Sequence, residues 1–390
     1  MRRPELSNLK GLFFIIILFT AAVHTGAAEI EPVQIPSART AALGGRHAAL
    51  TDDAGTLFSN PAGFRTAEPG FSVASIGVEL SGPIFDMTSL LLSGSSPDLG
   101  SEDVQDLMRN LYAGLNLPGP VTFAYVGNGL GFGIYNNTGI SFSTQGTLPT
   151  VTTEMKEEFI FAGGYSFRIP LPESWNSSLD LGALLSASAV GTSEVKKDLL
   201  SLYDAFNDPL GLIFNEPFEL ILGIGVDLGL LYSFGDRLAV GIVGRNLYAP
   251  NLVRGYASYQ DFLDSSSPST SRELTAIDLS AGVLYRPAWR FLERYVSDLK
   301  LMLDYEDILD FLTHPATSTN PLLHIGLGCE LELLDILYLR GGFYQALFSA
   351  GLGLDLSVIT FNLSMYGREL SPEPGLQPVY NVIISLEYDL

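Results

Sequence analysis

Few residues of this chain could support nucleophilic or metal chemistry. Beyond the N-terminal leader described below, the histidines are His47, His314 and His324, and Cys329 is the single cysteine. A hydrolase needs a nucleophile with a general base beside it, and a metal site needs suitably spaced ligands. Neither pattern occurs, and the Gly-x-Gly pairs lie in strand-like runs rather than in phosphate loops. We therefore predict a protein that is not an enzyme and has no metal or cofactor, with its histidines satisfied by polar neighbours.

Cations offer a different chemistry, the binding of a carboxylate group. One arginine in an otherwise apolar site would hold the head group of such a molecule. We select Arg46 and Arg340 as candidate substrate contacts. The alternative role is pairing with carboxylates, and Lys300 beside Asp304 and Glu306 is expected to do this. The strand alternation described next predicts that five cations of the strands point inward: Arg168, Arg245, Lys300, Arg340 and Arg368. Three further cations, Arg39, Arg46 and Arg65, lie in the N-terminal segment.

Strands must position these groups, because apolar and polar residues alternate along much of the chain. In residues 380–390 the even positions are tyrosine or aliphatic, and the odd ones are mostly polar, as at Glu387 and Asp389. Residues 348–358 and 222–232 repeat the pattern, with glycine, serine and aspartate on the polar face. A period of two is that of a β-strand, whose side chains point alternately to its two faces.

Fourteen such runs follow one another along the chain. The predicted strands are residues 70–80, 119–126, 130–142, 155–168, 178–192, 218–233, 237–247, 273–285, 298–306, 322–332, 336–345, 347–357, 358–368 and 378–390. Their number is even, as bacterial barrels require. With the N-terminus in the periplasm, the odd-numbered connections face outside, and these include the long ones, such as 81–118 and 193–217. Long outer loops and tight inner turns are typical of such barrels.

Composition favours a membrane barrel over the other classes. The mean hydropathy is +0.26, yet no uninterrupted apolar stretch of about 18 residues follows the leader, which excludes helical spans. In a soluble sandwich, the alternative, the apolar faces would meet a second sheet. The acidic, glycine-rich opposite faces instead favour a lumen, and a closed barrel satisfies its backbone hydrogen bonds in lipid. The net charge of −22 argues against nucleic acid as a partner.

The chain begins with a secretory signal and divides into three parts. Arg2, Arg3 and Lys10 precede an apolar run at 12–23, and Gly26-Ala27-Ala28 provides small residues for cleavage. We predict a signal peptide at 1–28, an N-terminal plug segment at 29–69 and a transmembrane antiparallel β-barrel at 70–390. The fold class is therefore all-β, with about fourteen strands.

The plug segment lacks a period of two and is rich in small residues. It reads S-A-R-T-A-A-L-G-G at 37–45, A-A-L-T-D-D-A at 48–54 and L-F-S-N-P-A-G at 57–63. Pro61 fixes φ, and Asn60 can cap the turn with its side chain. These stretches resemble the hatch of the FadL/TodX outer-membrane transporter family, whose N-P-A motif matches Asn60, Pro61 and Ala62. The resemblance is closest to the spirochaetal branch of that group.

The resemblance implies a plugged barrel in the bacterial cell outer membrane. It also implies passive uptake of long-chain fatty acids or other hydrophobic small molecules, with no energy source. We place Asn60, Pro61 and Ala62 on the substrate path together with Arg46 and Arg340. The partners expected are therefore hydrophobic small molecules and outer-membrane lipid, while no periplasmic partner can be named.

The family also implies a lateral exit from the lumen, created by a kink in the third strand. Here the third strand is residues 130–142, and Asn136 breaks its apolar face by pointing toward lipid. We therefore predict a lateral opening at Asn136, Asn137, Thr138 and Gly139. The alternative is a local β-bulge.

A different function remains open for the same architecture. A plugged barrel can act as a structural or protein-secretion partner, a shuttle or an anchor, in the outer membrane. A general aqueous porin fits less well, because the plug would block it and fourteen strands are few for a wide channel.

Overall fold

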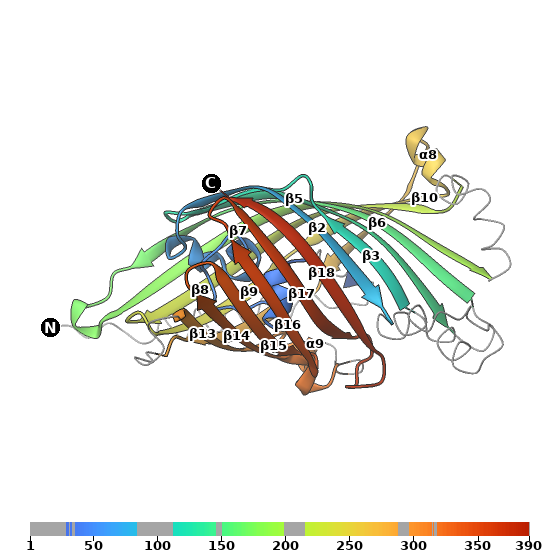
Figure 1. Ribbon diagram of the computed structural model, residues 1–390. Coiled ribbons are helices and arrows are strands. Elements are labelled where there is room, and N and C mark those ends of the chain that lie inside the picture. Colours follow the sequence, from blue (N-terminus) through green and yellow to red (C-terminus); the bar gives the residue numbers. More distant parts are fainter. Residues whose placement is uncertain are drawn as a thin grey trace, which may run out of the picture.

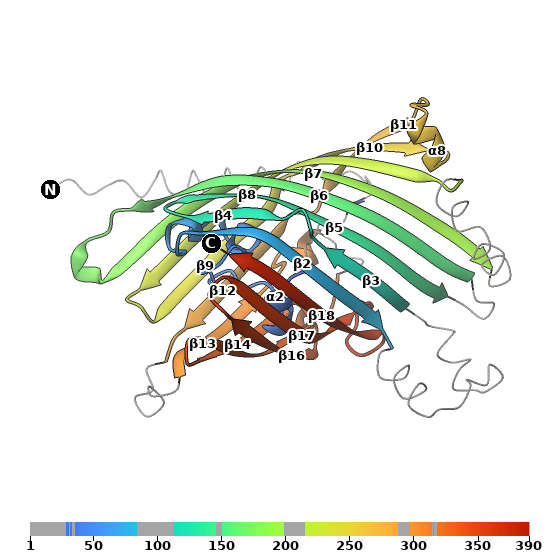
Figure 2. The ribbon, with the colours of Figure 1, turned by 45° about the horizontal axis from the view of Figure 1, so that its top comes forward.

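The chain forms a closed antiparallel β-barrel, seen from the side in Figures 1 and 2. The computed structural model describes residues 29–30, 32, 36–83, 112–145, 150–198, 215–287, 296–313, 315 and 318–389. The leader predicted at 1–28 and His314 lie outside the described residues. The last strand closes the barrel by pairing antiparallel with the first, from Tyr380 opposite Gly82 to Asp389 opposite Ser72.

The wall contains fourteen strands, three of which are interrupted. Its segments are β2 (Gly70–Gly82), β3 (Tyr112–Pro118), β4 (Phe123–Gly127), β5 (Leu130–Gln145), β6 (Thr150–Ile169), β7 (Ser177–Asp198), β8 (Phe218–Phe234), β9 (Leu238–Tyr248), β10 (Pro250–Tyr256), β11 (Ser269–Thr275), β12 (Asp278–Tyr285), β13 (Val296–Tyr305), β14 (Ile325–Leu333), β15 (Leu337–Tyr344), β16 (Leu347–Asp355), β17 (Ile359–Glu369) and β18 (Pro378–Asp389). β3 with β4, β9 with β10, and β11 with β12 each make one strand. This confirms the predicted fold class and the number of strands.

The second strand is longer than its sequence pattern predicts. The pattern places it at 119–126, whereas the structure extends it back to Tyr112 and interrupts it at 119–122, between β3 and β4. A separate two-residue strand, β1 (Glu29–Ile30), pairs parallel with β11. Short helices complete the described elements: α2 (Ala38–Ala42), α3 (Thr56–Ser59), η1 (Pro61–Arg65), η2 (Glu173–Trp175), α8 (Tyr259–Leu263), α9 (Asp310–Thr313) and η3 (Pro321–His324).

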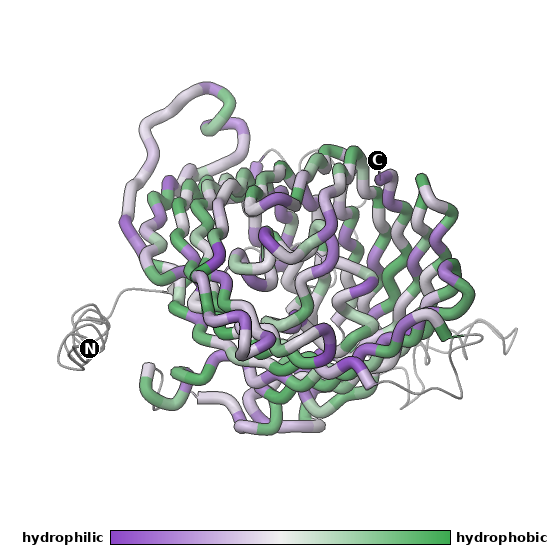
Figure 3. The backbone as a smooth tube through the Cα atoms, turned by 90° about the vertical axis from the view of Figure 1, so that its left-hand side faces the viewer, coloured by the Kyte–Doolittle hydropathy of each residue, from purple (hydrophilic) through white to green (hydrophobic). Residues whose placement is uncertain are grey.

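Alternation along each strand separates an apolar outer face from a more polar inner one. On β8 the side chains of Leu222, Ile224 and Leu228 are 36%, 55% and 49% exposed on the outside, while Gly223 and Gly225 face inward. Figure 3 shows apolar and polar residues alternating around the wall. This closed wall with an apolar exterior is the architecture of a transmembrane barrel. Among the described residues, no helix is long and apolar enough to cross a membrane.

The wall is uneven in height. β6 and β7 have 20 and 22 residues, whereas β15 on the other side has 8. Figure 1 shows the long strands running well past the ends of the short ones. We call β5–β8 together with β10 and β11 the extended wall. Because a strand rises about 3.3 Å per residue, this wall projects beyond the membrane on one side.

Residues 36–67 lie inside the barrel (Figures 2 and 3). Ser37 caps α2 by accepting a hydrogen bond from Thr40 N. Asn60 caps η1 in the same way, with 3.0 Å between its Oδ1 and Ala62 N, which confirms the predicted cap. Each cap satisfies a backbone N–H that a short helix would otherwise leave without a partner.

Glycines on the inner face of the extended wall make room for the Asn60–Ala62 turn. A Cβ at Gly229 would stand 2.0 Å from Asn60 Oδ1, and one at Gly182 would stand 2.3 Å from the Pro61 carbonyl carbon. Only glycine allows the two backbones to approach this closely. These glycines therefore fit the N-terminal segment to the wall.

Candidate functional site

A buried ionic network joins the N-terminal segment to β13, β14 and β15. Glu330, 1% exposed, accepts hydrogen bonds from Arg39 at 2.7 and 2.8 Å, Lys300 at 2.9 Å and Arg340 at 2.8 Å. Asp52 accepts from Arg39 and from Lys300, each at 2.8 Å. Three cations thus face three carboxylates, the third being Asp53, 2.6 Å from Arg39. We call this set the ionic network.

The ionic network holds its members in their charged forms. Burial disfavours the charge of Arg39, but Asp52, Asp53 and Glu330 outweigh it and raise the pKa of Arg39 well above its usual value. Burial likewise opposes ionisation of Asp52, yet the charges of Arg39 and Lys300 hold the pKa of this carboxyl well below its usual range. Paired buried charges of this kind fix one geometry, because removal of any partner leaves another uncompensated.

Arg340, one of the two predicted substrate cations, belongs to the ionic network. Its remaining hydrogen bond goes to Asn362 Oδ1 at 2.6 Å, and its guanidinium lies 5.0 Å from the centre of the Tyr338 ring. Lys300 bonds to Asp52 and Glu330 rather than to Asp304 and Glu306 as the sequence suggests. Lys300 therefore joins the wall to the N-terminal segment, whereas Arg340 holds Glu330 from within the wall.

His47 makes a second buried connection. Its Nδ1 lies 2.6 Å from Asp304 and its Nε2 lies 2.9 Å from the Leu43 carbonyl oxygen. Both partners can only accept, so the ring is fully satisfied as the imidazolium ion. Burial lowers the pKa of His47, but the hydrogen bond and charge of Asp304 outweigh burial and raise it above that of free histidine. This is a structural histidine with no nucleophile beside it.

Apolar contacts hold the N-terminal segment to the opposite wall. Leu57 and Phe64 are fully buried among Ala124, Ile160 and Leu184. The Asn60 side chain donates to the Ala48 and Leu230 carbonyl oxygens at 2.7 and 3.1 Å. Asn60, Pro61 and Ala62 are thus buried against β7 and β8 and line neither of the lumen cavities described next.

Two adjoining cavities remain in the lumen. The first, about 440 Å³, is lined largely by polar side chains, including Glu79, Asn116 and Arg368. The second, about 340 Å³, has an apolar part formed by Ile160, Leu184, Val190 and Ala249, and its lining also includes polar residues such as Ser186, Asp227 and Arg245. The residues common to both linings are Pro32, Arg46, Phe58, Glu154 and Lys156. The lumen therefore offers a polar compartment and a less polar one, here called the apolar compartment, and Arg46 is among the residues where the two meet.

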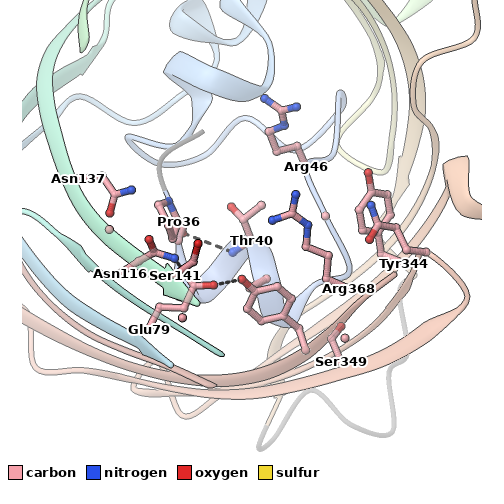
Figure 4. Close-up of a pocket in the computed structure, with 18 of the residues that line it drawn as sticks. Pro36, Thr40, Arg46, Glu79, Asn116, Asn137, Ser141, Tyr344, Ser349 and Arg368 are labelled. Atoms are coloured by element: carbon pink, nitrogen blue, oxygen red, sulfur yellow. Dashed lines mark hydrogen bonds between the residues drawn. The ribbon is translucent and has the colours of Figure 1, made fainter. Parts of the chain in front are cut away.

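Arg46 and Arg368 are the weakly paired cations of the polar compartment. Figure 4 shows both side chains reaching into this cavity. Arg46 lies 3.9 Å from Asp278, whose carboxylate is held more closely by Arg245 at 2.9 Å. Arg368 is exposed, and no ion pair to it is found within the described part of the chain. Two cations in one cavity suit an anionic group such as a carboxylate. The alternation in the sequence predicts that Arg368 points inward, but it does not predict that Arg368 has no ion-pair partner among the described residues.

The residues selected for a lateral opening lie beside the interruption of the second strand. β5 pairs with β6 without a break along its whole length. On the other side, residues 119–122 fold over Asn136, which accepts from Val121 N at 2.8 Å through Oδ1 and from Gly119 N at 2.9 Å through its carbonyl. Asn136 is consequently 6% exposed although it lies on the outward face. Asn137 faces the polar compartment and donates to Glu158 at 3.0 Å.

The other two selected residues differ in position. Thr138 is exposed on the outer face and donates to Glu157, whereas Gly139 lines the polar compartment. In β2, residues 73–78 lie between the stretches that pair with β4 and with β3. The irregularity of the wall therefore belongs to the second strand, next to the predicted position.

Comparison with known proteins places the fold. No protein-family model matches the chain, and no curated protein matches it in sequence. The Ralstonia pickettii toluene transporter TbuX superposes with a TM-score of 0.50 at 13% identity, over 93% of this chain and 98% of that one. The P. putida toluene transporter TodX gives 0.49 at 12% identity, over 92% and 99%. A Pseudomonas aeruginosa FadL homologue gives 0.44 at 13%, over 93% and 99%. The predicted resemblance is thus confirmed as a shared fold, that of the toluene transporter TbuX.

Proposed function

We propose that the protein is a channel for hydrophobic small molecules in the bacterial outer membrane, with long-chain fatty acids as its substrates and residues 29–69 as its plug. The observation that carries the proposal is the pair of adjoining lumen cavities. Their volumes lie within the range of about 300–1,000 Å³ usual for small-molecule sites. One has an apolar part formed by aliphatic side chains, and the other holds two weakly paired arginines, which matches a molecule with an apolar tail and an anionic head.

Charge favours a carboxylate over a neutral hydrocarbon. The solved toluene transporters share the fold, but a hydrocarbon offers Arg46 and Arg368 no acceptor. A carboxylate placed between the two guanidinium groups would remove their mutual repulsion and form charge-assisted hydrogen bonds. Arg46 stands at the junction of the two cavities, so a head group there leaves the tail in the apolar compartment.

The proposed substrate path leaves the lumen through the wall near Asn136–Gly139. The interruption at 119–122 leaves part of β2 without a continuous ladder partner, and backbone ladders are what close a barrel to lipid. A molecule in the polar compartment lies against Asn137 and Gly139. Release between β2 and the 119–122 segment would deliver it sideways into the membrane.

Binding measurements with matched ligands test the head-group assignment. The full chain in detergent is titrated with a C16 fatty acid and with the C16 alcohol. For the double variant Arg46→Gln/Arg368→Gln we expect acid affinity to fall at least about tenfold, since each charge-assisted bond contributes about 1.5–3 kcal/mol. Affinity for the alcohol should stay within about twofold. Arg65→Gln, an exposed arginine outside both cavities, is the matched control. Equal loss for acid and alcohol would contradict the assignment.

A further inference from the structure

Two arginines stand on the outer face of the extended wall. On β8 the even-numbered residues from Leu222 to Leu228 point outward, and side chains directly opposite across strands share a face. Arg254 of β10 is opposite Leu220 of β8. Arg272 of β11 is opposite Leu252, which is itself opposite Leu222. Both arginines therefore point away from the lumen, and they are diagonal neighbours across the β10–β11 pair.

The arginines lie at the level of lipid head groups. The apolar outer band of β8 runs from the exposed Phe234 up to Leu222. Twelve residues at about 3.3 Å each, on a strand tilted by about 40°, span roughly 30 Å, the thickness of the hydrocarbon core. Leu222 and Leu220 therefore mark the upper edge of that core, and Arg254 and Arg272 stand beside them.

Neither arginine has a carboxylate partner among the described residues. In the described ranges no carboxylate forms an ion pair with Arg254 or Arg272, and Arg272 is exposed. The chain carries 43 acidic residues against 21 basic ones, so two adjacent arginines without an acidic partner are unusual on this surface. Arginine pairs bind phosphate oxygens through forked hydrogen bonds.

An apolar cavity opens on the same outer face. Its volume is about 270 Å³, and its lining includes Leu115, Leu117, Ile140, Met155, Phe218 and Tyr259. The Phe218 ring lies 6.4 Å from Tyr256 and 4.8 Å from Phe262, measured between ring centres. Tyr256 is two residues from Arg254 on β10, so its side chain is the next one outward on that strand. The aromatic cluster thus connects the outer cavity to the two arginines.

We propose that this face binds a phosphorylated membrane lipid, with its phosphate on Arg254 and Arg272 and an acyl chain in the outer cavity. The site goes beyond the proposed transport function, since the two arginines point away from the lumen. The outer cavity shares Gly139, Ile140 and Lys156 with the polar compartment, so its occupant is tested separately below. Charge and depth select the occupant: a phosphate at head-group level is complementary to the arginines, and the attached chain reaches the cavity along the membrane surface.

Lipid retention by the purified full chain tests the proposal. The protein in neutral detergent is mixed with dioleoyl phosphatidic acid, and bound lipid is counted by native mass spectrometry after detergent exchange. We expect Arg254→Gln/Arg272→Gln to retain at least about tenfold less of this lipid. Arg237→Gln, an exposed arginine of the turn after β8, should behave as the wild type. Unchanged retention in the double variant would overturn the proposal.

Further variants and ligands distinguish this lipid from other molecules that could occupy the site. Met155→Trp fills the outer cavity and should lower retention of phosphatidic acid while leaving uptake of a fluorescent fatty acid unchanged. Reduced uptake with full lipid retention would assign the cavity to the transported molecule instead. Inorganic phosphate at millimolar concentration should not displace the lipid, and complete displacement would show a free-phosphate site. Dioleoylglycerol, which lacks the phosphate, should not be retained. Equal melting temperatures of the variants exclude misfolding as the cause.

Discussion

Replacing Glu330 by glutamine should release the N-terminal segment from the wall. In the ionic network Arg39, Lys300 and Arg340 face Asp52, Asp53 and Glu330, and Asp298 lies 3.7 Å from Lys300. Glu330 receives four of its hydrogen bonds and is 1% exposed. Glu330→Gln removes one negative charge from beside three cations, at the most deeply buried carboxylate of the network.

The expected cost follows from the contacts that remain. Breaking a buried ion pair costs about 3–5 kcal/mol. Arg39 and Lys300 keep Asp52, and Arg340 keeps Asn362, so we expect the lower end, about 3 kcal/mol. The ratio of docked to undocked segment should therefore fall by a factor of roughly 150, since about 1.4 kcal/mol corresponds to tenfold.

Hydrogen exchange measures this release directly. Amides of residues 38–64 in the reconstituted protein should exchange about 150-fold faster in Glu330→Gln, while amides of β6 and β7 remain protected. Asp335→Asn is the control, because it removes one carboxylate from an exposed turn just after β14. Unchanged protection of residues 38–64, or equal deprotection in the control, would refute the assigned role of the ionic network.

Three further changes test other contacts of the segment. The raised pKa of His47 predicts that its contribution to docking is complete below about pH 6.5 and is lost as pH rises through the folded-state pKa. The protection factors of amides 43–48, which correct for intrinsic exchange, should fall over that rise in pH, and His47→Gln should abolish this pH dependence. Gly229→Val would place its Cβ 2.0 Å from Asn60 Oδ1 and should expose the segment to protease, whereas Gly341→Val, with open space around its Cβ, should not. Phe64→Ala, at a side chain with no exposed surface, should destabilise docking by about 3–5 kcal/mol, and denaturant titration of segment exchange with no shift would contradict this.

The wall could be predicted from the sequence because strand period and lipid exposure are local properties. Residues 348–358 show both in the printed order of side chains, and parity alone turns Arg340 and Arg368 inward. The interruption at 119–122 was not visible, since it depends on how β3 and β4 each pair with β2 and β5. Pairing with the neighbouring strands therefore determines where the second strand is interrupted.

The partners of the lumen charges could not be predicted. Lys300 has Asp304 and Glu306 nearby in sequence, but Asp304 binds His47 and Glu306 binds the Tyr344 hydroxyl. Its hydrogen-bond partners are Glu330, 30 residues away, and Asp52, 248 residues away. Contacts between the N-terminal segment and the wall depend on the register of the strands and on how the segment docks inside the barrel. Local periodicity in the sequence determines neither.

The central claim is that hydrophobic molecules cross this barrel, past an N-terminal segment that the Asn60–Ala62 turn fixes to the wall. Uptake of a fluorescent C16 fatty acid into liposomes containing the protein tests it most directly, compared with the double variant Asn60→Ala/Pro61→Ala and with protein-free liposomes. We expect uptake well above the protein-free background for the wild type and an altered rate for the variant. Uptake equal to that background would contradict transport and leave a structural or secretion role for the barrel.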